Sequence, residues 1–219
     1  MEKSKEAPGM IHVICCDIGH MDAEEYRRLF DASPAERQER ARRYVRQEDK
    51  VRCVTAHALV RYAVEKALNL SEFTVERDEQ GKPHIQGRED FHFNLSHSGS
   101  WVVIAYGASP VGVDVERIRM DAGKENIARR HFTREEQEYV FSAGEENGER
   151  FFEIWTAKES YLKYLGTGLR RSLNSFSVVL DGTGLGVRFT GRRLGDSYLT
   201  VCTRQEDITF TQLTPGQLG

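Results

Sequence analysis

The feature that most constrains this chain is an uninterrupted helical segment from Phe151 to Leu165. It contains no Pro or Gly, and Gly166 follows it directly, which predicts one helix with a glycine stop. On a helical wheel one broad apolar arc holds Phe151, Ile154, Trp155, Tyr161, Leu162 and Leu165. Lys158 falls at the centre of that arc. Because an unpaired buried charge is costly, the helix has either a snorkelling lysine or a site that uses its charge.

Glu159 and Lys163 lie four residues apart at the edge of the same arc, beside Trp155. One interpretation is an ordinary i,i+4 ion pair, worth roughly 0.2–0.5 kcal/mol. The other is that both side chains belong to a functional site. This helix alone leaves both interpretations open.

Composition limits the classes of protein that need to be considered. With 219 residues, 39% hydrophobic and 30% charged, the chain can build a substantial core as one large domain or two small ones. A net charge of −3 argues against a general nucleic-acid binder. The longest apolar run, Trp101–Tyr106, is too short to span a bilayer, and the first residues lack the apolar core of a signal peptide. The cysteines show no metal-ligand spacing, which favours a reduced, cytoplasmic compartment; they are Cys15, Cys16, Cys53 and Cys202.

The N-terminal part predicts a strand at residues 11–17 and a helix at residues 22–30. Ser33-Pro34-Ala35-Glu36 has the pattern of a capping box with proline at the first helical position. We expect the helix that it opens to have a basic first half and a buried second half. The basic half is either a solvated face or an anion site. An anion site is possible because one guanidinium group can donate two hydrogen bonds to phosphate oxygens, and the candidate residues for it are Arg37, Arg40 and Arg52.

The next region predicts a β-hairpin. Gly81-Lys82-Pro83 is a turn, and Phe91, Phe93 and Leu95 alternate with polar residues along a strand whose apolar side faces inward. A turn at residues 97–100 leads into the returning strand. His97 is therefore expected at a strand end, where a side chain either points into solvent or meets a ligand.

Val111–Glu116 is the second informative stretch. Its valines form one face of a strand, while Gly112, Asp114 and Glu116 form the other. The two carboxylates are then roughly 6.5–7 Å apart at Cα, and like charges this close favour a cation between them. The alternative is a solvated strand face. We favour a divalent-metal site, since Gly112 would leave room for a ligand and oxygen donors suit Mg²⁺.

The remainder predicts a second group of helices and strands. Residues 133–136 have the capping-box pattern, opening a helix through Phe141, and strands are predicted at 176–180, 186–189 and 198–202. The order of helices and strands suggests an α+β protein of two halves that meet near residue 110. We divide the chain into an N-terminal half, residues 1–109, and a C-terminal half, residues 110–219, which carries the metal-binding strand and helix.

Taken together, four stretches resemble the Sfp-type 4′-phosphopantetheinyl transferases. In chain order they are Gly81-Lys82-Pro83, Asn94-Leu95-Ser96-His97-Ser98-Gly99, Gly112-Val113-Asp114-Val115-Glu116 and Trp155-Thr156-Ala157-Lys158-Glu159-Ser160-Tyr161-Leu162-Lys163. The likeness extends from about Ser33 to Phe176. Each stretch alone is weakly specific, but the four in this order are typical of the family.

The resemblance implies a monomer built as a pseudo-twofold pair of similar α+β halves, with coenzyme A and Mg²⁺ in the cleft between them. Such enzymes transfer the 4′-phosphopantetheine moiety of coenzyme A to a serine of an apo acyl- or peptidyl-carrier protein and release 3′,5′-ADP. The clients belong to fatty-acid, polyketide or nonribosomal-peptide biosynthesis. Neither nucleic acid nor a membrane is an expected partner.

The resemblance also implies residue roles. The Mg²⁺ ligands would be Asp114, Glu116 and Glu159. Phosphate oxygens would be contacted by Lys158, Lys163 and His97. The nucleotide end would be held by Lys82 and Ser96, with its phosphates gripped by Arg37, Arg40 and Arg52. The carrier serine needs a proton acceptor, for which Glu159, directly or through a metal-bound water, is the candidate and Lys163 the alternative.

Two other classes of function remain as alternatives. Strand carboxylates with a nearby lysine also suit a Mg²⁺-dependent nuclease or phosphodiesterase, although here the third acid and the lysine are predicted on a helix. A non-enzymatic module that binds anions or docks carrier proteins would use only the arginine-rich helix. That second alternative gives no role to Asp114, Glu116 or Glu159.

Overall fold

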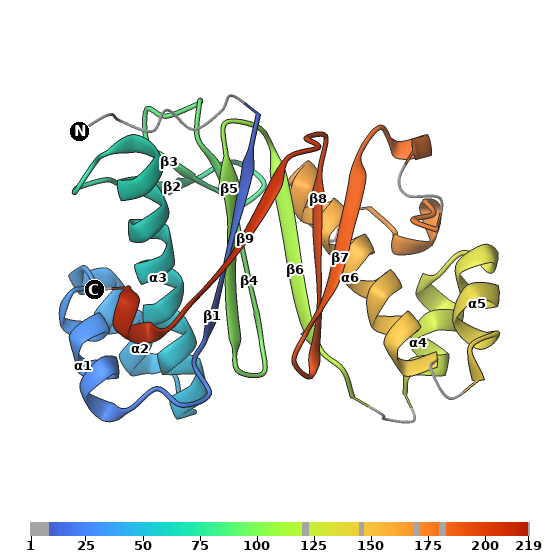
Figure 1. The fold of residues 1–219 in the computed structure, drawn as a ribbon, viewed down its shortest axis with the longest axis horizontal. Coiled ribbons are helices and arrows are strands. Elements are labelled where there is room, and N and C mark those ends of the chain that lie inside the picture. The colour runs from blue at the N-terminus through green and yellow to red at the C-terminus, as the bar shows by residue number, and fades with distance from the viewer. Residues whose placement is uncertain (1–8, 120–122, 145–146, 169–170, 180–182, 219) are drawn as a thin grey trace.

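The computed structural model describes residues 9–119, 123–144, 147–168, 171–179 and 183–218, and it has the α+β composition that the sequence predicts (Figure 1). Its helices are α1 (Ala23–Asp31), α2 (Ala35–Arg43), α3 (Gln47–Leu68), α4 (Lys124–His131), α5 (Arg134–Phe141) and α6 (Asn147–Leu165). Its strands are β1 (Ile11–Asp17), β2 (Val75–Arg77), β3 (Pro83–Ile85), β4 (His92–Ser98), β5 (Trp101–Gly107), β6 (Val111–Arg117), β7 (Arg188–Leu194), β8 (Ser197–Thr203) and β9 (Ile208–Leu213). Short 3-10 helices are η3 (Leu173–Ser175), η4 (Thr183–Leu185) and η5 (Pro215–Gln217).

Two sheets form the centre of the molecule. One has the strand order β4-β5-β1-β9 and the other the order β6-β8-β7, while β2 and β3 make a small separate hairpin. Helices α1, α2 and α3 lie on the outer side of the first sheet, and α4, α5 and α6 lie on the outer side of the second (Figure 1). The chain is therefore arranged as helices, sheet, sheet and helices.

Strand β5 shows how side-chain alternation fills this arrangement. All seven of its residues are buried. Val102, Ile104 and Tyr106 belong to the core beneath α3, whereas Trp101 and Val103 belong to the core between the two sheets. A third core packs α6 and its neighbouring helices on the second sheet. A strand buried on both faces reads as a continuous apolar run, as this one does.

The last strand, β9, crosses back to the first sheet. It pairs in parallel with β1, with Ile208 opposite Ile11 and Leu213 opposite Cys16. Leu213 and Leu218 are buried in the core beneath α3. The end of the chain is thus part of the sheet and the core that the N-terminal segments build.

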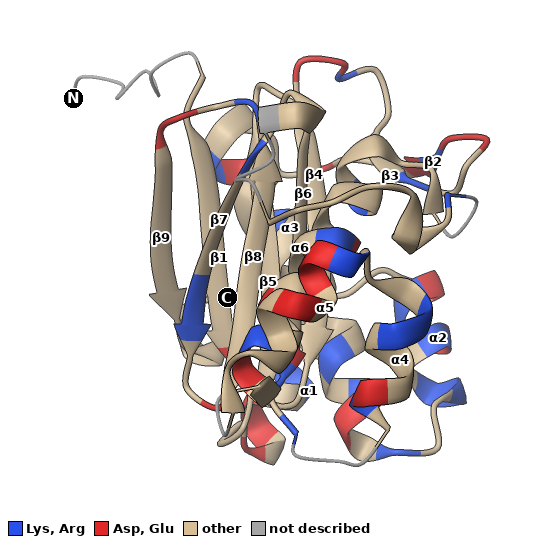
Figure 2. Cartoon of the chain, turned by 90° about the vertical axis from the view of Figure 1, so that its right-hand side faces the viewer, with Lys and Arg blue, Asp and Glu red and all other residues tan. Residues whose placement is uncertain are grey.

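The helix expected after Ser33 is in fact two helices. The chain is extended at Tyr44 and Arg46, which separates α2 from α3 and lets the polar α2 fold back beside α3. Basic residues follow one another closely along α2 (Figure 2). The predicted capping box is wrong, because Pro34 is the N-cap and the Ser33 hydroxyl instead donates to the Leu29 carbonyl at the end of α1.

Two other predictions about local structure have different outcomes, and one strand was not predicted. Thr133 and Glu136 do form the predicted capping box of α5. The strand expected at residues 176–180 is wrong for residues 176–179, which contain no strand, and residue 180 lies outside the described residues. Strand β9 was not predicted; its alternation of apolar and polar residues covers only Ile208–Thr211 and breaks at Gln212.

No helix in the described part of the chain has the length and apolar character needed to cross a membrane. The cysteines are free and buried at positions 15, 16, 53 and 202. Burial raises the pKa of Cys15 to about 11 and that of Cys16 to about 12, which keeps both thiols protonated and unreactive.

Candidate active site

A row of polar side chains on β4 joins the two sheets at their adjacent edges. The Asn94 side-chain oxygen accepts a hydrogen bond from the Val113 backbone N–H at 3.0 Å. The Ser96 and Ser98 hydroxyls accept from the next alternate N–H groups of β6, those of Val115 at 3.2 Å and Arg117 at 3.1 Å. We call Asn94, Ser96 and Ser98 the polar ladder. It pairs β6 with β4 through side chains where backbone pairing is absent.

The same serines hold the two strand carboxylates. Ser96 donates its hydroxyl to Asp114 Oδ1 at 2.9 Å, and Ser98 donates to Glu116 Oε2 at 2.7 Å. Hydrogen bonds to an ionised carboxylate are roughly twice as strong as neutral ones. The ladder therefore fixes both the strand and the acids that it carries.

Lys163 reaches this site from α6. Its Nζ lies 2.7 Å from Asp114 Oδ1, 3.0 Å from Ser96 Oγ and 3.1 Å from the Val113 carbonyl. An ammonium has three N–H donors, so all of them are used. The side chain nevertheless remains 29% exposed, so solvent and ligands can approach it.

Glu116 and Glu159 complete a group of acids whose charges affect one another. Burial raises the pKa of Glu159 and the Asp114 carboxylate raises it further, while Lys163 lowers it. Burial also raises the pKa of Glu116, the hydrogen bond from Ser98 lowers it, and Asp114 raises it. Raised carboxyl pKa values are expected where several acids share one low-dielectric site.

The metal site expected from the sequence is not preassembled. Among the described residues, no three His, Cys, Asp or Glu side chains are grouped closely enough to hold a metal ion. One observation does fit a cation, however: Asp114 Oδ2 is buried and has no hydrogen-bond partner. Carboxylate oxygens from Asp114, Glu116 and Glu159 are the donor type that Mg²⁺ prefers, so the residues fit the ion although their arrangement is not closed around it.

Gly112 has a role different from the expected one. A Cβ built at this position would lie 2.0 Å from the Ser160 carbonyl and 2.5 Å from the Tyr164 backbone nitrogen, both in α6. The glycine therefore lets the backbone of α6 lie directly on β6. The space that we expected for a ligand is occupied by the helix, and this contact places Glu159 and Lys163 beside Asp114.

A cavity of about 280 Å³ opens next to this group, lined by Lys82, Asn94, Glu159, Lys163 and residues of the neighbouring turns. Burial lowers the pKa of Lys82. Its ammonium donates to the Tyr164 carbonyl near the end of α6 at 2.9 Å.

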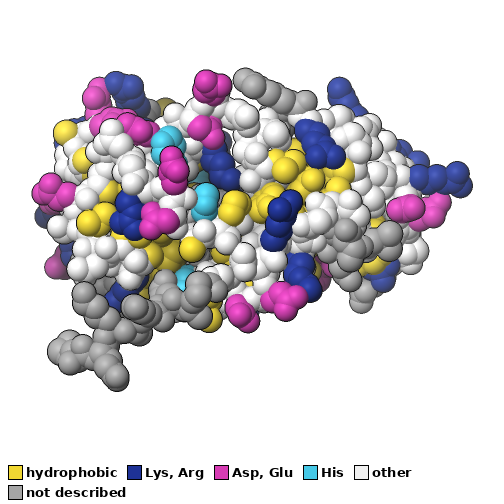
Figure 3. All heavy atoms as spheres, turned by 90° about the horizontal axis from the view of Figure 1, so that it is seen from above, with side chains coloured by type: hydrophobic (Ala, Val, Ile, Leu, Met, Phe, Trp, Pro, Cys, Tyr) yellow, Lys and Arg dark blue, Asp and Glu magenta, His cyan; other side chains and the backbone are white. Residues whose placement is uncertain are grey.

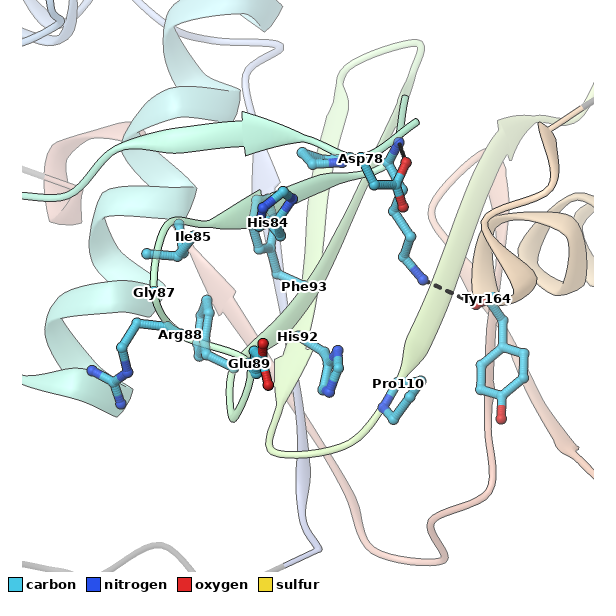
Figure 4. A pocket seen from close by; sticks show the side chains of 13 residues that line it. Asp78, His84, Ile85, Gly87, Arg88, Glu89, His92, Phe93, Pro110 and Tyr164 are labelled. Carbon is cyan, nitrogen blue, oxygen red and sulfur yellow. Dashed lines mark hydrogen bonds between the residues drawn. The ribbon is translucent and has the colours of Figure 1, made fainter. Parts of the chain in front are cut away.

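A larger cavity of about 490 Å³ shares Lys82 and Pro83 with the first and includes His84, His92 and Tyr164 (Figure 4). The hydrogen bond from Lys82 to Tyr164 is dashed in that view. Seen from above, histidine side chains lie left of the centre of the molecule with hydrophobic side chains beside them, and charged side chains are spread over the whole visible face (Figure 3). The two cavities together offer a recess of mixed charge with apolar walls, next to the carboxylates.

His97 and Arg52 lie on the opposite flank of the site. His97 is exposed, yet the surrounding protein removes enough solvent to lower its pKa, and the charges of Arg52 and Lys163 lower it further. Arg52 donates to the Gly99 carbonyl at 2.7 and 3.3 Å and to Asp49 at 2.8 Å. It thus holds the turn that follows β4.

The other two arginines of the expected nucleotide site stay on α2. Arg40 is bonded to Tyr44, which raises the pKa of the guanidinium. Arg37 lies near His57, where burial and the Arg37 charge both lower the pKa of the imidazole. No interaction among the described residues connects Arg37 or Arg40 with Asp114 or Lys163.

The structure places Lys158 away from the candidate site. The side chain is fully buried, 2.8 Å from Glu136 Oε2, and donates to the Leu173 and Phe176 carbonyls at 2.7 Å each. Burial lowers the pKa of Lys158, while Glu136 raises it. All three donors are used inside the C-terminal core, which leaves none for a phosphate. The expected phosphate contact does not fit this placement.

Ser96 is also used differently from the expectation. Its hydroxyl donates to Asp114 and accepts from Val115 and Lys163, which exhausts one donor and two acceptor positions. It holds the acidic site and has no capacity left for a nucleotide. The sequence did not reveal two side-chain contacts, that of Ser98 with Glu116 and that of Glu136 with Lys158. The period-two spacing of Ser98 with Ser96 could have revealed the first, whereas the link from Glu136 to Lys158 had no sequence signal.

Comparison with known families gives two matches that together cover most of the chain. Residues 21–109 match the family described as 4′-phosphopantetheinyl transferase, N-terminal. Residues 110–210 match the 4′-phosphopantetheinyl transferase superfamily.

Individual relatives give the same result. The chain is 37% identical over 169 residues to a 4′-phosphopantetheinyl transferase of Bacillus subtilis, covering 75% of this chain and 74% of that relative. It is 34% identical over 167 residues to the 4′-phosphopantetheinyl transferase Sfp of B. subtilis strain 168, with coverage of 75% and 74%. It is 38% identical over 148 residues to the 4′-phosphopantetheinyl transferase gsp of Aneurinibacillus migulanus, with coverage of 65% and 60%.

Proposed function

The chain belongs to the 4′-phosphopantetheinyl transferase superfamily, and we propose that Asp114, Glu116, Glu159 and Lys163 form the centre of its active site. It is an enzyme that transfers the phosphopantetheine moiety of coenzyme A to carrier proteins. The observation that carries the residue assignment is that Asp114 Oδ2 is buried and has no hydrogen-bond partner. This oxygen belongs to a site that also contains Glu116, Glu159 and Lys163.

In this proposal Asp114, Glu116 and Glu159 hold one Mg²⁺ at the diphosphate of coenzyme A. The bound ion would supply positive charge where the reaction builds negative charge on phosphate oxygens. Asp114 would use its free Oδ2, since Oδ1 accepts from Ser96 and Lys163. Glu159, whose pKa responds to the charges of Asp114 and Glu116, would act together with these two strand acids.

The cations around the site bind the phosphates of coenzyme A. Lys163 exchanges one of its present hydrogen bonds for a phosphate oxygen, and His97 contacts an oxygen from the opposite flank. Lys82, in the wall of the adjoining cavities, supports the nucleotide end. Arg52, Arg37 and Arg40 contribute positive charge toward the nucleotide phosphates. Cations fixed before the reaction stabilise the charge that develops on the β-phosphate and on the departing 3′,5′-ADP.

Glu159 is the proton acceptor for the carrier serine in this proposal. It lines the cavity next to Lys163, where it can accept the proton directly or through a water molecule. Lys163, the alternative, is an ammonium paired with Asp114 at 2.7 Å. An ammonium cannot accept a proton, so the ion pair favours Glu159.

We further propose that the enzyme is a monomer that works in the cytoplasm, with neither nucleic acid nor a membrane as partner. The net charge of −3 supports the first exclusion. The division into halves at residues 109 and 110 is part of the same proposal. The cleft between the halves would then be bordered by β4 on one side and by β6 and α6 on the other.

The experiment that tests the proposed function is intact-mass analysis of several apo carrier proteins after incubation with the enzyme, coenzyme A and Mg²⁺. We expect a mass increase of one phosphopantetheine group, and none when EDTA replaces Mg²⁺. Equal modification with EDTA would reject the metal assignment. Nothing in the comparisons supports the nuclease alternative, and cleavage of plasmid with Mg²⁺ in a parallel reaction would be needed to restore it.

A further inference from the structure

Ser98 is the member of the polar ladder that contacts Glu116. Its side chain is buried, with 8% of its surface exposed. The hydroxyl donates to Glu116 Oε2 at 2.7 Å and accepts from the Arg117 N–H at 3.1 Å. One small side chain from the first sheet therefore holds both an acid of the second sheet and the backbone next to that acid.

The three members of the polar ladder differ in whether they contact only the backbone of β6 or also one of its acids. Asn94 only accepts from the backbone of β6, whereas Ser96 and Ser98 each also donate to a carboxylate. Asp114 has Lys163 as a second donor. For Glu116, no hydrogen bond other than that from Ser98 is assigned within the described residues. The orientation of the Glu116 carboxylate therefore depends on Ser98 more than that of Asp114 depends on Ser96.

Ser98 is itself held firmly. It pairs with Trp101 across the β4–β5 hairpin, and the following residue, Gly99, accepts two hydrogen bonds from Arg52. A Cβ at Gly99 would lie 3.4 Å from the Arg117 side chain, so the turn also packs against the end of β6. A hydroxyl fixed in this way can fix the group to which it donates.

We propose that Ser98 is a positioning residue that orients the Glu116 carboxylate for divalent-cation binding. This inference rests on the proposed function, because it assigns Glu116 to the cation. Residues that orient metal ligands by hydrogen bonds often contribute 10- to 100-fold, roughly, to metal affinity. The proposal also means that residues of the first sheet shape an acidic site carried by the second.

The test compares Mn²⁺ binding to the full-length wild-type protein and to Ser98→Ala, followed by electron paramagnetic resonance without coenzyme A. We expect the Kd for Mn²⁺ to increase about tenfold or more. The Mg²⁺ concentration that gives half-maximal transfer should increase by a similar factor. The rate at saturating Mg²⁺ should recover most of the wild-type value, because the cation itself then orders Glu116.

Ser33→Ala is the matched control. This serine is also buried, but its hydroxyl donates to the Leu29 backbone carbonyl at the end of α1 and not to an acid of the site. We expect it to lower the thermal stability without changing the Kd for Mn²⁺. A Ser33→Ala variant with the same loss of Mn²⁺ affinity as Ser98→Ala would overturn the proposal, since general destabilisation would then explain both.

A double-mutant cycle tests whether Ser98 acts through Glu116. Glu116→Gln should weaken Mn²⁺ binding, and adding Ser98→Ala should weaken it no further, because the carboxylate that Ser98 orients is already gone. Additive losses would overturn the positioning role. If the wild type binds no Mn²⁺ and transfers no phosphopantetheine, the proposed function fails. If it does both and Ser98→Ala binds Mn²⁺ equally well, only this inference fails.

Discussion

At the scale of single residues, the candidate site is defined by how completely its hydrogen bonds are used. Ser96 and Lys163 each have every donor satisfied, and Asp114 has one oxygen bonded and one buried without a partner. A buried polar atom without a partner is costly and is rare in native proteins. Such an atom is expected where a bound ligand supplies the missing partner. The unpaired Asp114 oxygen is therefore the strongest sign of function in this structure.

Glu159→Gln tests the acid on the helix. The amide keeps the size of the side chain but can neither accept the serine proton nor carry the charge. We expect phosphopantetheine transfer to fall by about 10²- to 10⁴-fold, the usual contribution of a general base. The urea midpoint should stay near that of the wild type, because Glu159 makes no side-chain hydrogen bond with any of the residues that the structure describes. Transfer within a few-fold of the wild-type rate would contradict the role of Glu159.

Lys158 and Glu136 form a buried ion pair of a different kind. Both side chains are 0% exposed, and the carboxylate also accepts from the backbone N–H groups of Thr133 and Val178. Glu136 therefore completes the capping box of α5 and at the same time forms an ion pair with Lys158 of α6. The pair belongs to the core of the C-terminal helices, and its expected role is stability.

Lys158→Met should lower the free energy of unfolding by about 3–5 kcal/mol, since it leaves the Glu136 charge buried without a partner. Urea unfolding followed by circular dichroism measures this change. The double variant Lys158→Met, Glu136→Gln should recover part of the loss, because the remaining amide carries no charge. A single variant as stable as the wild type would show that the ion pair contributes nothing. The affinity for coenzyme A, measured on folded protein, should be unchanged.

At the scale of elements, the contact between β6 and α6 sets the geometry of the site. Gly112 lets the two backbones touch, and the same contact aligns Asp114 on the strand with Lys163 on the helix. Any side chain at position 112 must push the helix away from the strand. The glycine is therefore a determinant of the site although it carries no functional group.

Gly112→Ala should destabilise the protein by about 3 kcal/mol or more, the upper range for overpacking, because the new Cβ meets backbone rather than a movable side chain. Transfer activity should fall as well, since the helix acids and lysine shift away from Asp114. Gly184→Ala is the control, because nothing lies within 4 Å of its Cβ position. Thermal unfolding and transfer assays check both variants. Equal behaviour of the two variants would refute the close contact.

Elements could be predicted from the sequence where local signals agree with their tertiary surroundings. The strand at residues 111–116, the long helix ending at Gly166 and the capping box at Thr133 are all present. The residues at Ser33 fit the capping-box pattern as well as those at Thr133 do, yet the Ser33 hydroxyl donates to a carbonyl of α1. A side chain with two possible backbone partners is decided by which one the packing brings near.

At the scale of the whole molecule, the two sheets are joined by more than a linker. Between them lies a shared apolar core that includes Val13, Trp101, Val113 and Val201, and the polar ladder closes the edge beside it. The return of β9 to the first sheet adds a third connection. The halves are therefore expected to unfold as one unit.

A variant with one tryptophan tests this cooperativity. The chain has two tryptophans, so Trp101→Phe leaves Trp155 in α6 as the only tryptophan, which can be excited selectively at the red edge of its absorption. Its fluorescence follows the C-terminal half, while far-ultraviolet circular dichroism also follows α1, α2 and α3. We expect both signals to have the same urea midpoint, the behaviour of a two-state protein. Separate midpoints would show that the halves unfold independently.

The sequence by itself determined the α+β class, the family and the presence of the acids and Lys163 as candidates, because these depend on local periodicity and on short motifs. Only the tertiary structure decided which charges meet. It paired Lys158 with Glu136 instead of a phosphate, filled the space at Gly112 with α6 and engaged the Ser96 hydroxyl with Asp114. It also revealed Ser98 as the hydrogen-bond donor to Glu116. The physical reason is that a buried charge or hydroxyl takes the partners that packing brings within about 3 Å, and those partners come from segments far away in the sequence.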